Sequence, residues 1–183
     1  RAYEIAQLAH DLATSGCGYH LGEREMGPVR PIREGNEMPP MRTVLSADDV
    51  RRALTRIAHE IVERNQGVAG LAVVGLQRGG VWVAQALAGL LSAIDPQQHV
   101  PLGSLDVSFH RDDVGLRPIV PASVTDIAGS LDGRTIVLVD DVLFTGRTVR
   151  AALAALNEYG RPRAVQLAVP IDRGHRELPI RPP

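Results

Sequence analysis

Short runs of apolar residues alternate along the chain with longer segments whose apolar positions repeat every three or four residues. The runs at 71–76, 136–139 and 164–169 are four to six residues long and rich in Val, Leu, Ile and Ala. Such runs are typical of strands buried on both faces of a sheet. Because segments with helical spacing separate them, we expect one α/β domain with a central parallel sheet flanked by helices.

Three segments have helical spacing. The first begins at Ser46, which forms a capping-box pattern with Asp49. Its apolar stripe consists of Val50, Leu54, Ile57, Ala58 and Ile61. The second, 81–93, is apolar almost all round, which indicates a buried helix. The third follows Gly146, and its stripe consists of Val149, Ala152, Leu153 and Leu156. Residues 104–110 instead alternate apolar and polar side chains, which predicts a further strand.

A parallel sheet places the loops that follow its strands along one edge, where α/β proteins bind ligands. Four polar loops are predicted at this edge, at 77–80, 110–113, 140–148 and 172–177. The stretch from 114 to about 130 has no clear periodicity, and in a compact domain a loop of this length is often a functional lid.

The loop 140–148 carries the most specific chemistry. Asp140 and Asp141 follow a buried strand, and Thr145 and Gly146 precede a helix. Backbone N–H groups at a helix N-terminus bind anions, most naturally a phosphate, whereas two carboxylates suit vicinal hydroxyls or a divalent metal. Together these groups predict a site for a ribose 5-phosphate. The alternative is structural: a buried strand with an acidic end, followed by an N-capped helix.

Composition narrows the function classes. With 20 basic and 21 acidic residues the net charge is −1, so no overall basic field favours nucleic acid or an anionic membrane, and we expect neither DNA nor a membrane as partner. Every basic residue is arginine, which excludes a Walker-type or Schiff-base lysine. Aromatic residues make up only 3%, which argues against a base-stacking platform. Without a membrane-length apolar run or a signal-peptide core, a cytoplasmic location is expected.

Residues 1–44 differ in composition from the remainder. Between Thr14 and Pro40, Gly, Pro, Arg and Glu are frequent and apolar anchors are few, so we expect a disordered N-terminal extension. The spacing of His10, Cys17 and His20 matches no zinc-binding pattern. We therefore assign the folded domain to residues 45–183.

The loop at 140–148 and the strand before it resemble the 5-phosphoribosyl-1-pyrophosphate (PRPP) motif of type I phosphoribosyltransferases, with an apolar strand, two acids and a Thr-Gly-x-Thr loop. Further segments resemble the PyrR family of pyrimidine-operon attenuation proteins, which are uracil phosphoribosyltransferases. They are 51–60, 105–113, 139–150, 160–169 and 172–181. The last segment separates this family from other phosphoribosyltransferases.

The resemblance implies transfer of the phosphoribosyl group of PRPP to uracil, giving UMP and pyrophosphate, with Mg²⁺ bound through PRPP and no direct metal site on the protein. It implies catalytic roles for Asp140, Asp141 and Arg111. The PRPP-binding residues would be Val139, Asp140, Asp141, Val142, Leu143, Phe144, Thr145, Gly146, Arg147 and Thr148. The pyrophosphate loop would be Gln77, Arg78, Gly79 and Gly80, and the base-side loop would contain Asp172, Arg173, His175 and Arg176.

The resemblance also leaves a second class of function open, an RNA-binding attenuator that uses the PRPP and UMP site only as a nucleotide sensor. The arginines predicted to contact leader mRNA are Arg51, Arg52, Arg56 and Arg150. Because the family forms dimers and tetramers, we expect a homodimer or a larger homo-oligomer.

The chain departs from the family pattern at three places. The pyrophosphate loop reads Gln-Arg-Gly-Gly where the family often has Thr-Arg-Gly, and His110 replaces the usual tyrosine. The family pattern continues beyond Pro183 through Asp-Tyr-Val-Gly-Lys-Asn and a final strand, so the domain is expected to be short of that pattern at its C-terminus.

Overall fold

The two inner strands of the sheet are buried along their whole length, as their unbroken apolar sequences predict. The computed structural model describes residues 45–77, 79–108, 125–127 and 129–182. Within these residues the main sheet has four parallel strands in the order β2-β1-β3-β5. The strands are β1 (Leu71–Leu76), β2 (Leu102–Leu105), β3 (Thr135–Val139) and β5 (Ala164–Ala168).

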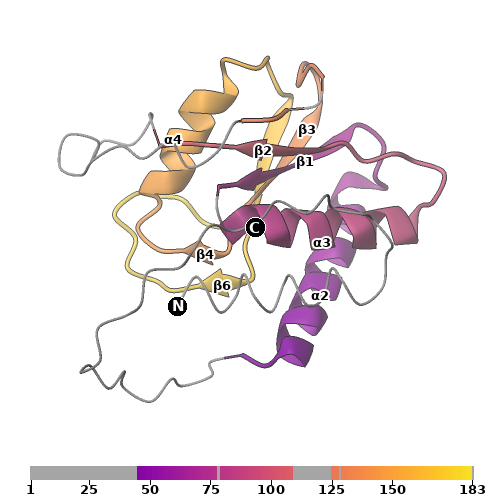
Figure 1. Ribbon diagram of the computed structural model, residues 1–183, viewed down its shortest axis with the longest axis horizontal. Helices are drawn as coiled ribbons and strands as arrows, with labels where there is room; N and C mark the ends of the chain where they lie inside the picture. Colours follow the sequence, from indigo (N-terminus) through magenta and orange to yellow (C-terminus); the bar gives the residue numbers. More distant parts are fainter. Residues whose placement is uncertain (1–44, 78, 109–124, 128, 183) are drawn as a thin grey trace, which may run out of the picture.

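Helices cover both faces of this sheet (Figure 1). On β3, Val137 and Val139 pack toward one pair of helices, whereas Ile136 and Leu138 pack toward a third helix on the other face. This alternation explains why the strand is apolar at every position. The pair on the first face is α2 (Ala47–Asn65) and α3 (Gly79–Ile94), and the helix on the second face is α4 (Arg147–Leu156).

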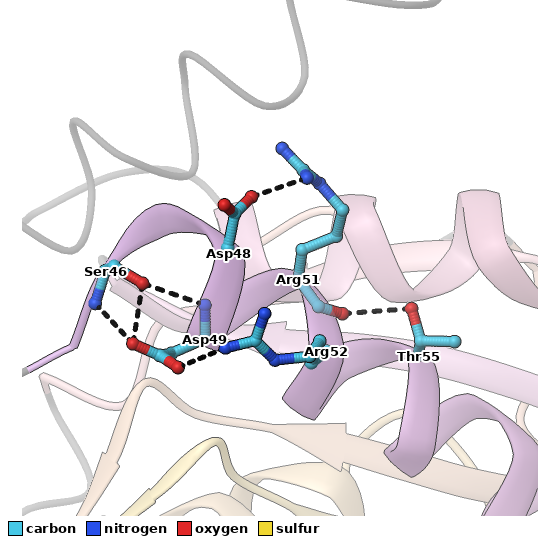
Figure 2. A network of polar contacts seen from close by, with 6 residues as sticks. All are labelled: Ser46, Asp48, Asp49, Arg51, Arg52 and Thr55. Atoms are coloured by element: carbon cyan, nitrogen blue, oxygen red, sulfur yellow. Dashed lines mark hydrogen bonds and ion pairs between the residues drawn. The ribbon is translucent and has the colours of Figure 1, made fainter.

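The start of α2 confirms the predicted capping box (Figure 2). The Ser46 hydroxyl accepts a hydrogen bond from the Asp49 N–H at 3.2 Å, and the Ser46 N–H donates to the Asp49 carboxylate at 3.0 Å. A cap of this kind stabilises a helix by about 1 kcal/mol. The helix ends where Gln66 adopts a left-handed backbone conformation, with φ 56°. The predicted apolar stripe faces the sheet, and its fully buried members are Val50, Leu54, Ala58 and Ile61.

Three predicted elements need correction. The strand predicted over 104–110 is β2, which begins at 102 and ends at Leu105; residues 109 and 110 lie outside the described residues. It ends there because an Asp106 carboxylate oxygen accepts hydrogen bonds from the Ser108 N–H and hydroxyl, at 2.8 and 2.5 Å, which turns the chain. The helix predicted over 81–93 begins at Gly79, so the glycine pair forms its first turn. In α4, Leu153 is 39% exposed rather than part of the core.

Strand β5 is at the edge of the sheet, and only its carboxyl half is buried. The prediction of a fully buried strand therefore holds for Leu167 and Ala168 but not for Ala164. At the middle of β5, Gln166 exchanges two amide hydrogen bonds of 3.0 and 2.9 Å with Asn65 at the end of α2. This pair fastens the last turn of α2 to the sheet edge.

A second, two-stranded parallel sheet lies beside the carboxyl ends of the main strands (Figure 1). It consists of β4 (Val142–Leu143) and β6 (Ile171–Asp172). The two strands belong to the loops 140–148 and 172–177, so this sheet brings two of the four predicted ligand loops together.

Candidate active site

The two acids of the loop 140–148 lie at the carboxyl end of β3, directly beside the first turn of α3. The Asp141 N–H donates to a carboxylate oxygen of Asp140 at 3.0 Å, and the Val142 N–H donates to Asp141 at 2.9 Å. Backbone groups therefore hold both carboxylates close to the main chain, and the buried strand beneath them provides a rigid base.

The glycine pair at 79–80 permits this close approach. A Cβ atom at Gly79 would collide with the Asp141 carboxylate, and one at Gly80 would collide with the Val139 carbonyl oxygen. No other residue type fits at either position without displacing α3 or the acids. The structure thus places the described part of the predicted pyrophosphate loop against the acid pair, whereas Arg78 lies outside the described residues, as does Arg111.

Electrostatics single out Asp140. Burial at the end of β3 and, as a smaller cause, the neighbouring Asp141 carboxylate together raise its pKa from 3.8 to about 8. The protein without ligand therefore carries a mostly protonated Asp140 at neutral pH. A protonated carboxyl donates a hydrogen bond as well as accepting one, which suits contact with hydroxyl groups.

The N-terminus of α4 lacks a side-chain cap from its N-cap residue. Its N-cap is Gly146, with φ 92°, and no side chain caps the first turn. Only a weak contact of 3.4 Å joins the Arg147 N–H to the Thr145 hydroxyl. Unpaired N–H groups and the positive end of the helix dipole make such a terminus a phosphate site. The Thr145 and Thr148 hydroxyls lie in the same short segment.

The base-side loop contacts the phosphate loop rather than standing apart from it. Besides the pairing of β4 with β6, the Arg173 N–H donates to the Leu143 carbonyl at 2.9 Å, and the Glu177 N–H donates to the Thr145 carbonyl at 3.1 Å. The Arg147 side chain is directed to Glu177, with Nε 2.6 Å from the carboxylate. Arg147 therefore contributes its backbone, not its guanidinium, to the open helix terminus. This pairing could not be predicted from the sequence, because two-residue strands are too short to show a periodic pattern.

Comparison with known proteins assigns the chain to a family. Residues 43–183 match the model of the phosphoribosyl transferase domain. The Bifunctional protein PyrR of Roseiflexus sp. (strain RS-1) is 58% identical over 141 residues, which cover 75% of each protein. That of Streptomyces coelicolor is 52% identical over 150 residues, which cover 81% of this chain and 77% of the relative. The chain belongs to the PyrR family of phosphoribosyltransferases. It is therefore built on the domain of a glycosyltransferase that moves a phosphoribosyl group.

Solved structures confirm the fold of this PyrR-family chain. A hypoxanthine phosphoribosyltransferase from Staphylococcus aureus aligns with a TM-score of 0.59 at 18% identity, covering 77% of this chain and 73% of that one. A hypoxanthine-guanine phosphoribosyltransferase from Bacillus anthracis aligns with a TM-score of 0.59 at 15% identity, and the alignment covers 79% of this chain and 80% of that one. The predicted central parallel sheet with flanking helices is thus confirmed as a type I phosphoribosyltransferase fold.

The base-side loop of the PyrR-family chain surrounds an exposed aromatic ring. Phe144 is 41% exposed, and the Arg173 guanidinium carbon lies 4.6 Å from its ring centroid. The His175 ring meets the Phe144 ring edge-on, with centroids 6.3 Å apart. His175 also adopts a left-handed backbone conformation, with φ 57°, which is uncommon outside glycine. Two of the four predicted base-side residues, Arg173 and His175, thus contact the phosphate loop through the ring of Phe144.

The four arginines predicted to contact RNA do not form one patch in the described structure. Arg51 and Arg52 form ion pairs of 2.7 and 2.6 Å with acids of the first turn of α2 (Figure 2). Arg56 has a looser contact of 3.7 Å with Glu60. Arg150 lies on α4, which covers the opposite face of the sheet. Only within an oligomer would Arg150 join the arginines of α2.

Sequence analysis missed Arg64, which lies two helical turns after Arg56 on α2. Both arginines line a groove of about 320 Å³ between α2 and the edge strand β5, together with Gln166 and Pro182. Two arginines about two turns apart on one predicted helix could have indicated from the sequence that Arg64 lies near Arg56. The Asp48 and Asp49 carboxylates, by contrast, leave the start of α2 with little net positive charge.

Proposed function

We propose that this PyrR-family protein transfers the phosphoribosyl group of PRPP to uracil, forming UMP and pyrophosphate. One juxtaposition is the main support: the first turn of α3, the acid pair at the end of β3 and the uncapped N-terminus of α4 lie along one edge of the sheet. PRPP has three parts that need such partners, namely a pyrophosphate, two ribose hydroxyls and a 5-phosphate.

Asp140 and Asp141 bind the ribose hydroxyls in this proposal. As the bond from C1′ to pyrophosphate breaks, positive charge develops on the ribose, and nearby carboxylates stabilise that charge. Asp140 is mostly protonated in the protein alone. The positive charge that develops on the ribose favours release of this proton, so that Asp140 acts as a carboxylate during the reaction. The backbone behind both acids is fixed by β3, so little reorganisation accompanies the reaction.

Anion binding is divided between two helix N-termini. The 5-phosphate binds the N–H groups of Gly146, Arg147 and Thr148 at the start of α4, with the Thr145 and Thr148 hydroxyls beside them. Pyrophosphate binds at the start of α3, where Gly79 is partly exposed and Gly80 packs against the end of β3. Arg78 and Arg111 are proposed to supply cationic donors to the departing pyrophosphate.

Phosphoribosyltransferases as a class use Mg²⁺ with PRPP, and we propose the same for this protein. Among the described residues, no group of three or more His, Cys, Asp or Glu side chains could hold a metal ion. The acid pair alone supplies carboxylate oxygens, the donor type that Mg²⁺ prefers, so it fits an ion held chiefly by PRPP. Mg²⁺ bound in this way neutralises charge on the pyrophosphate.

A radiolabelled uracil assay tests the transferase. Asp140→Asn and Asp141→Asn should each lower the rate of UMP formation by at least about 100-fold, which corresponds to roughly 3 kcal/mol of barrier. Glu63→Gln, at an exposed position on α2, is the matched control and should leave the rate unchanged. Unchanged UMP formation in both aspartate variants would refute the assignment of these roles.

We propose a second activity, UMP-responsive binding of the leader mRNA of a pyrimidine operon. The relatives are named bifunctional, and the groove lined by Arg56 and Arg64 offers a local site where overall charge offers none. Phosphate contacts dominate RNA affinity and make it salt-dependent. The groove is therefore the proposed contact surface, since the Arg56–Glu60 contact of 3.7 Å within it is looser than the 2.7 and 2.6 Å ion pairs of Arg51 and Arg52.

Filter binding against leader RNA, with and without UMP, tests this activity. Arg56→Gln and Arg64→Gln should each weaken RNA binding. Each should also reduce the slope of log affinity against log salt concentration by about one, because one phosphate contact is lost. Arg161→Gln, in an exposed position at the opposite end of the sheet, is the control. UMP-dependent binding without uracil turnover would instead identify a non-catalytic sensor, and turnover without RNA binding would leave only the transferase.

The remaining proposals concern context. We propose a folded domain over residues 45–183, which the family match from residue 43 supports. We also propose a homodimer or larger homo-oligomer, which light scattering at micromolar concentration tests.

Among the helices that the structure describes, none is long and apolar enough to cross a membrane. A cytoplasmic location is proposed, and fractionation of the native host measures it.

A further inference from the structure

Arg176 occupies the space between the base-side loop and the phosphate loop. Its side chain is only 19% exposed, although the loop around it is open to solvent. A guanidinium this well covered needs hydrogen-bond acceptors on several sides, because burying an unpaired charge is costly.

All three guanidinium nitrogens of Arg176 find such acceptors within the protein. Nη1 donates to the Phe144 carbonyl at 2.6 Å and to the Gly174 carbonyl at 3.3 Å. Nε donates to the Ile180 carbonyl at 2.9 Å, and Nη2 lies 2.7 Å from the Asp172 carboxylate. The acceptors come from the phosphate loop, the base-side loop and the segment that follows it.

We propose that Arg176 is a positioning residue that holds the base-side loop and the phosphate loop in one fixed arrangement. The inference rests on the proposed transferase function, and it assigns Arg176 no contact with substrate. Phe144, whose carbonyl Arg176 binds, directly precedes Thr145, whose own carbonyl accepts the Glu177 and Leu178 N–H groups at 3.1 and 3.2 Å. These contacts add to the β4–β6 pairing, the Arg173 N–H to Leu143 carbonyl bond and the Arg147–Glu177 ion pair, which also join the loops.

The fork shape of arginine explains why this residue type is needed. Donors in different directions reach the Phe144, Gly174 and Ile180 carbonyls at once, whereas a lysine ammonium is a single point on a flexible stem. Arg176→Lys therefore keeps the charge next to Asp172 but loses the contacts that join the loops. If charge alone mattered, the lysine variant would behave like the original protein.

Two ligands separate positioning from a general loss of structure. Ribose 5-phosphate needs only the acid pair and the phosphate loop, whereas UMP also carries a base that reaches the base-side loop. When the loops lose their fixed spacing, the uracil base contributes less to the binding affinity of UMP, whereas the contacts with the ribose phosphate remain. A purely structural defect would weaken both ligands by the same factor.

Isothermal titration of ribose 5-phosphate and UMP into the folded protein tests the inference. Arg176→Gln and Arg176→Lys should each weaken UMP binding by about tenfold or more, because small misplacements of a binding group cost this much. Ribose 5-phosphate binding should change by less than about threefold. Arg161→Gln, the same substitution in an exposed arginine, should change neither affinity.

Circular dichroism and thermal melting establish that each variant is folded. If Arg176→Gln does not fold, the two affinities of Arg176→Lys test the positioning role. If the affinities for both ligands fall by the same factor, or if the affinity for UMP does not fall, the positioning role is overturned. Absence of binding of either ligand to the original protein would instead overturn the proposed function, and the inference with it.

Discussion

The buried acid pair makes a prediction about stability that needs no substrate. In the folded protein the pKa of Asp140 is raised from 3.8 to about 8, chiefly by burial and then by the Asp141 carboxylate. Between these two values the folded state binds a proton that the unfolded state releases. Stability should therefore fall as pH rises from about 4 to about 8, and Asp140→Asn, which mimics the protonated form, should remove this decline.

The size of the effect follows from the same values. Each unit of pKa is worth about 1.4 kcal/mol, so the rise from 3.8 to about 8 sets an upper limit of about 6 kcal/mol. Asp140 is partly exposed, and solvent screens its charge, so we expect roughly 2 kcal/mol. Asp140→Asn should be about as stable as the original protein at pH 5 and more stable by this amount at pH 9.

Urea denaturation at pH 5, 7 and 9, followed by far-ultraviolet circular dichroism, measures this difference. Glu63→Gln is the control, because it removes an exposed carboxylate without altering the acid pair. If Asp140→Asn and the original protein lose stability in parallel as the pH rises, the carboxyl does not titrate as described. The same variant should lose UMP formation, so that greater stability accompanies lower activity.

Four further predictions concern two glycines of α3, a helix cap and a hydrogen-bonded pair. Gly80→Ala should destabilise the protein by about 1–3 kcal/mol, because the added Cβ collides with backbone at the end of β3. Gly89→Ala, in the same helix with nothing within 4 Å of the added atom, should stabilise by about 0.5–1 kcal/mol in the same denaturation assay. Ser46→Ala should cost about 1 kcal/mol through loss of the capping box, and an unchanged melting curve would contradict that role. A double-mutant cycle of Asn65→Ala and Gln166→Ala should show a coupling of about 0.5–1.5 kcal/mol, whereas strictly additive effects would refute a shared hydrogen-bonded pair.

Sequence reasoning succeeded where a local pattern determines the structure. The unbroken apolar run before Asp140 predicted a fully buried strand, and Ser46 predicted the start of α2, because both depend on residues that are close in the chain. It failed for β2, where the Asp106 side chain competes with the strand for backbone N–H groups. The partners of Arg176 were also hidden, since one of them, Phe144, is 32 residues away.

In the loop 140–148, the course of the backbone was easier to predict than the partners of the side chains. Gly146 lies at the predicted helix N-terminus with the left-handed conformation that favours glycine. Arg147 belongs to the same motif, yet its guanidinium pairs with Glu177 in another loop. A motif fixes where the chain turns, but long side chains reach across the fold and choose partners that spacing along the chain does not reveal.

The uncapped first turn of α4 has a consequence for how binding would be observed. Most helices complete their first turn with a side chain, which contributes about 1 kcal/mol; α4 has glycine there instead. A phosphate group would complete that turn, so ligand and helix would stabilise each other. Amide hydrogen exchange at the start of α4 should then slow when phosphate binds. Because a residue with a Cβ atom is strained at the φ of 92° that Gly146 adopts, a capping side chain cannot easily take over this position, and completion of the turn is left to a ligand.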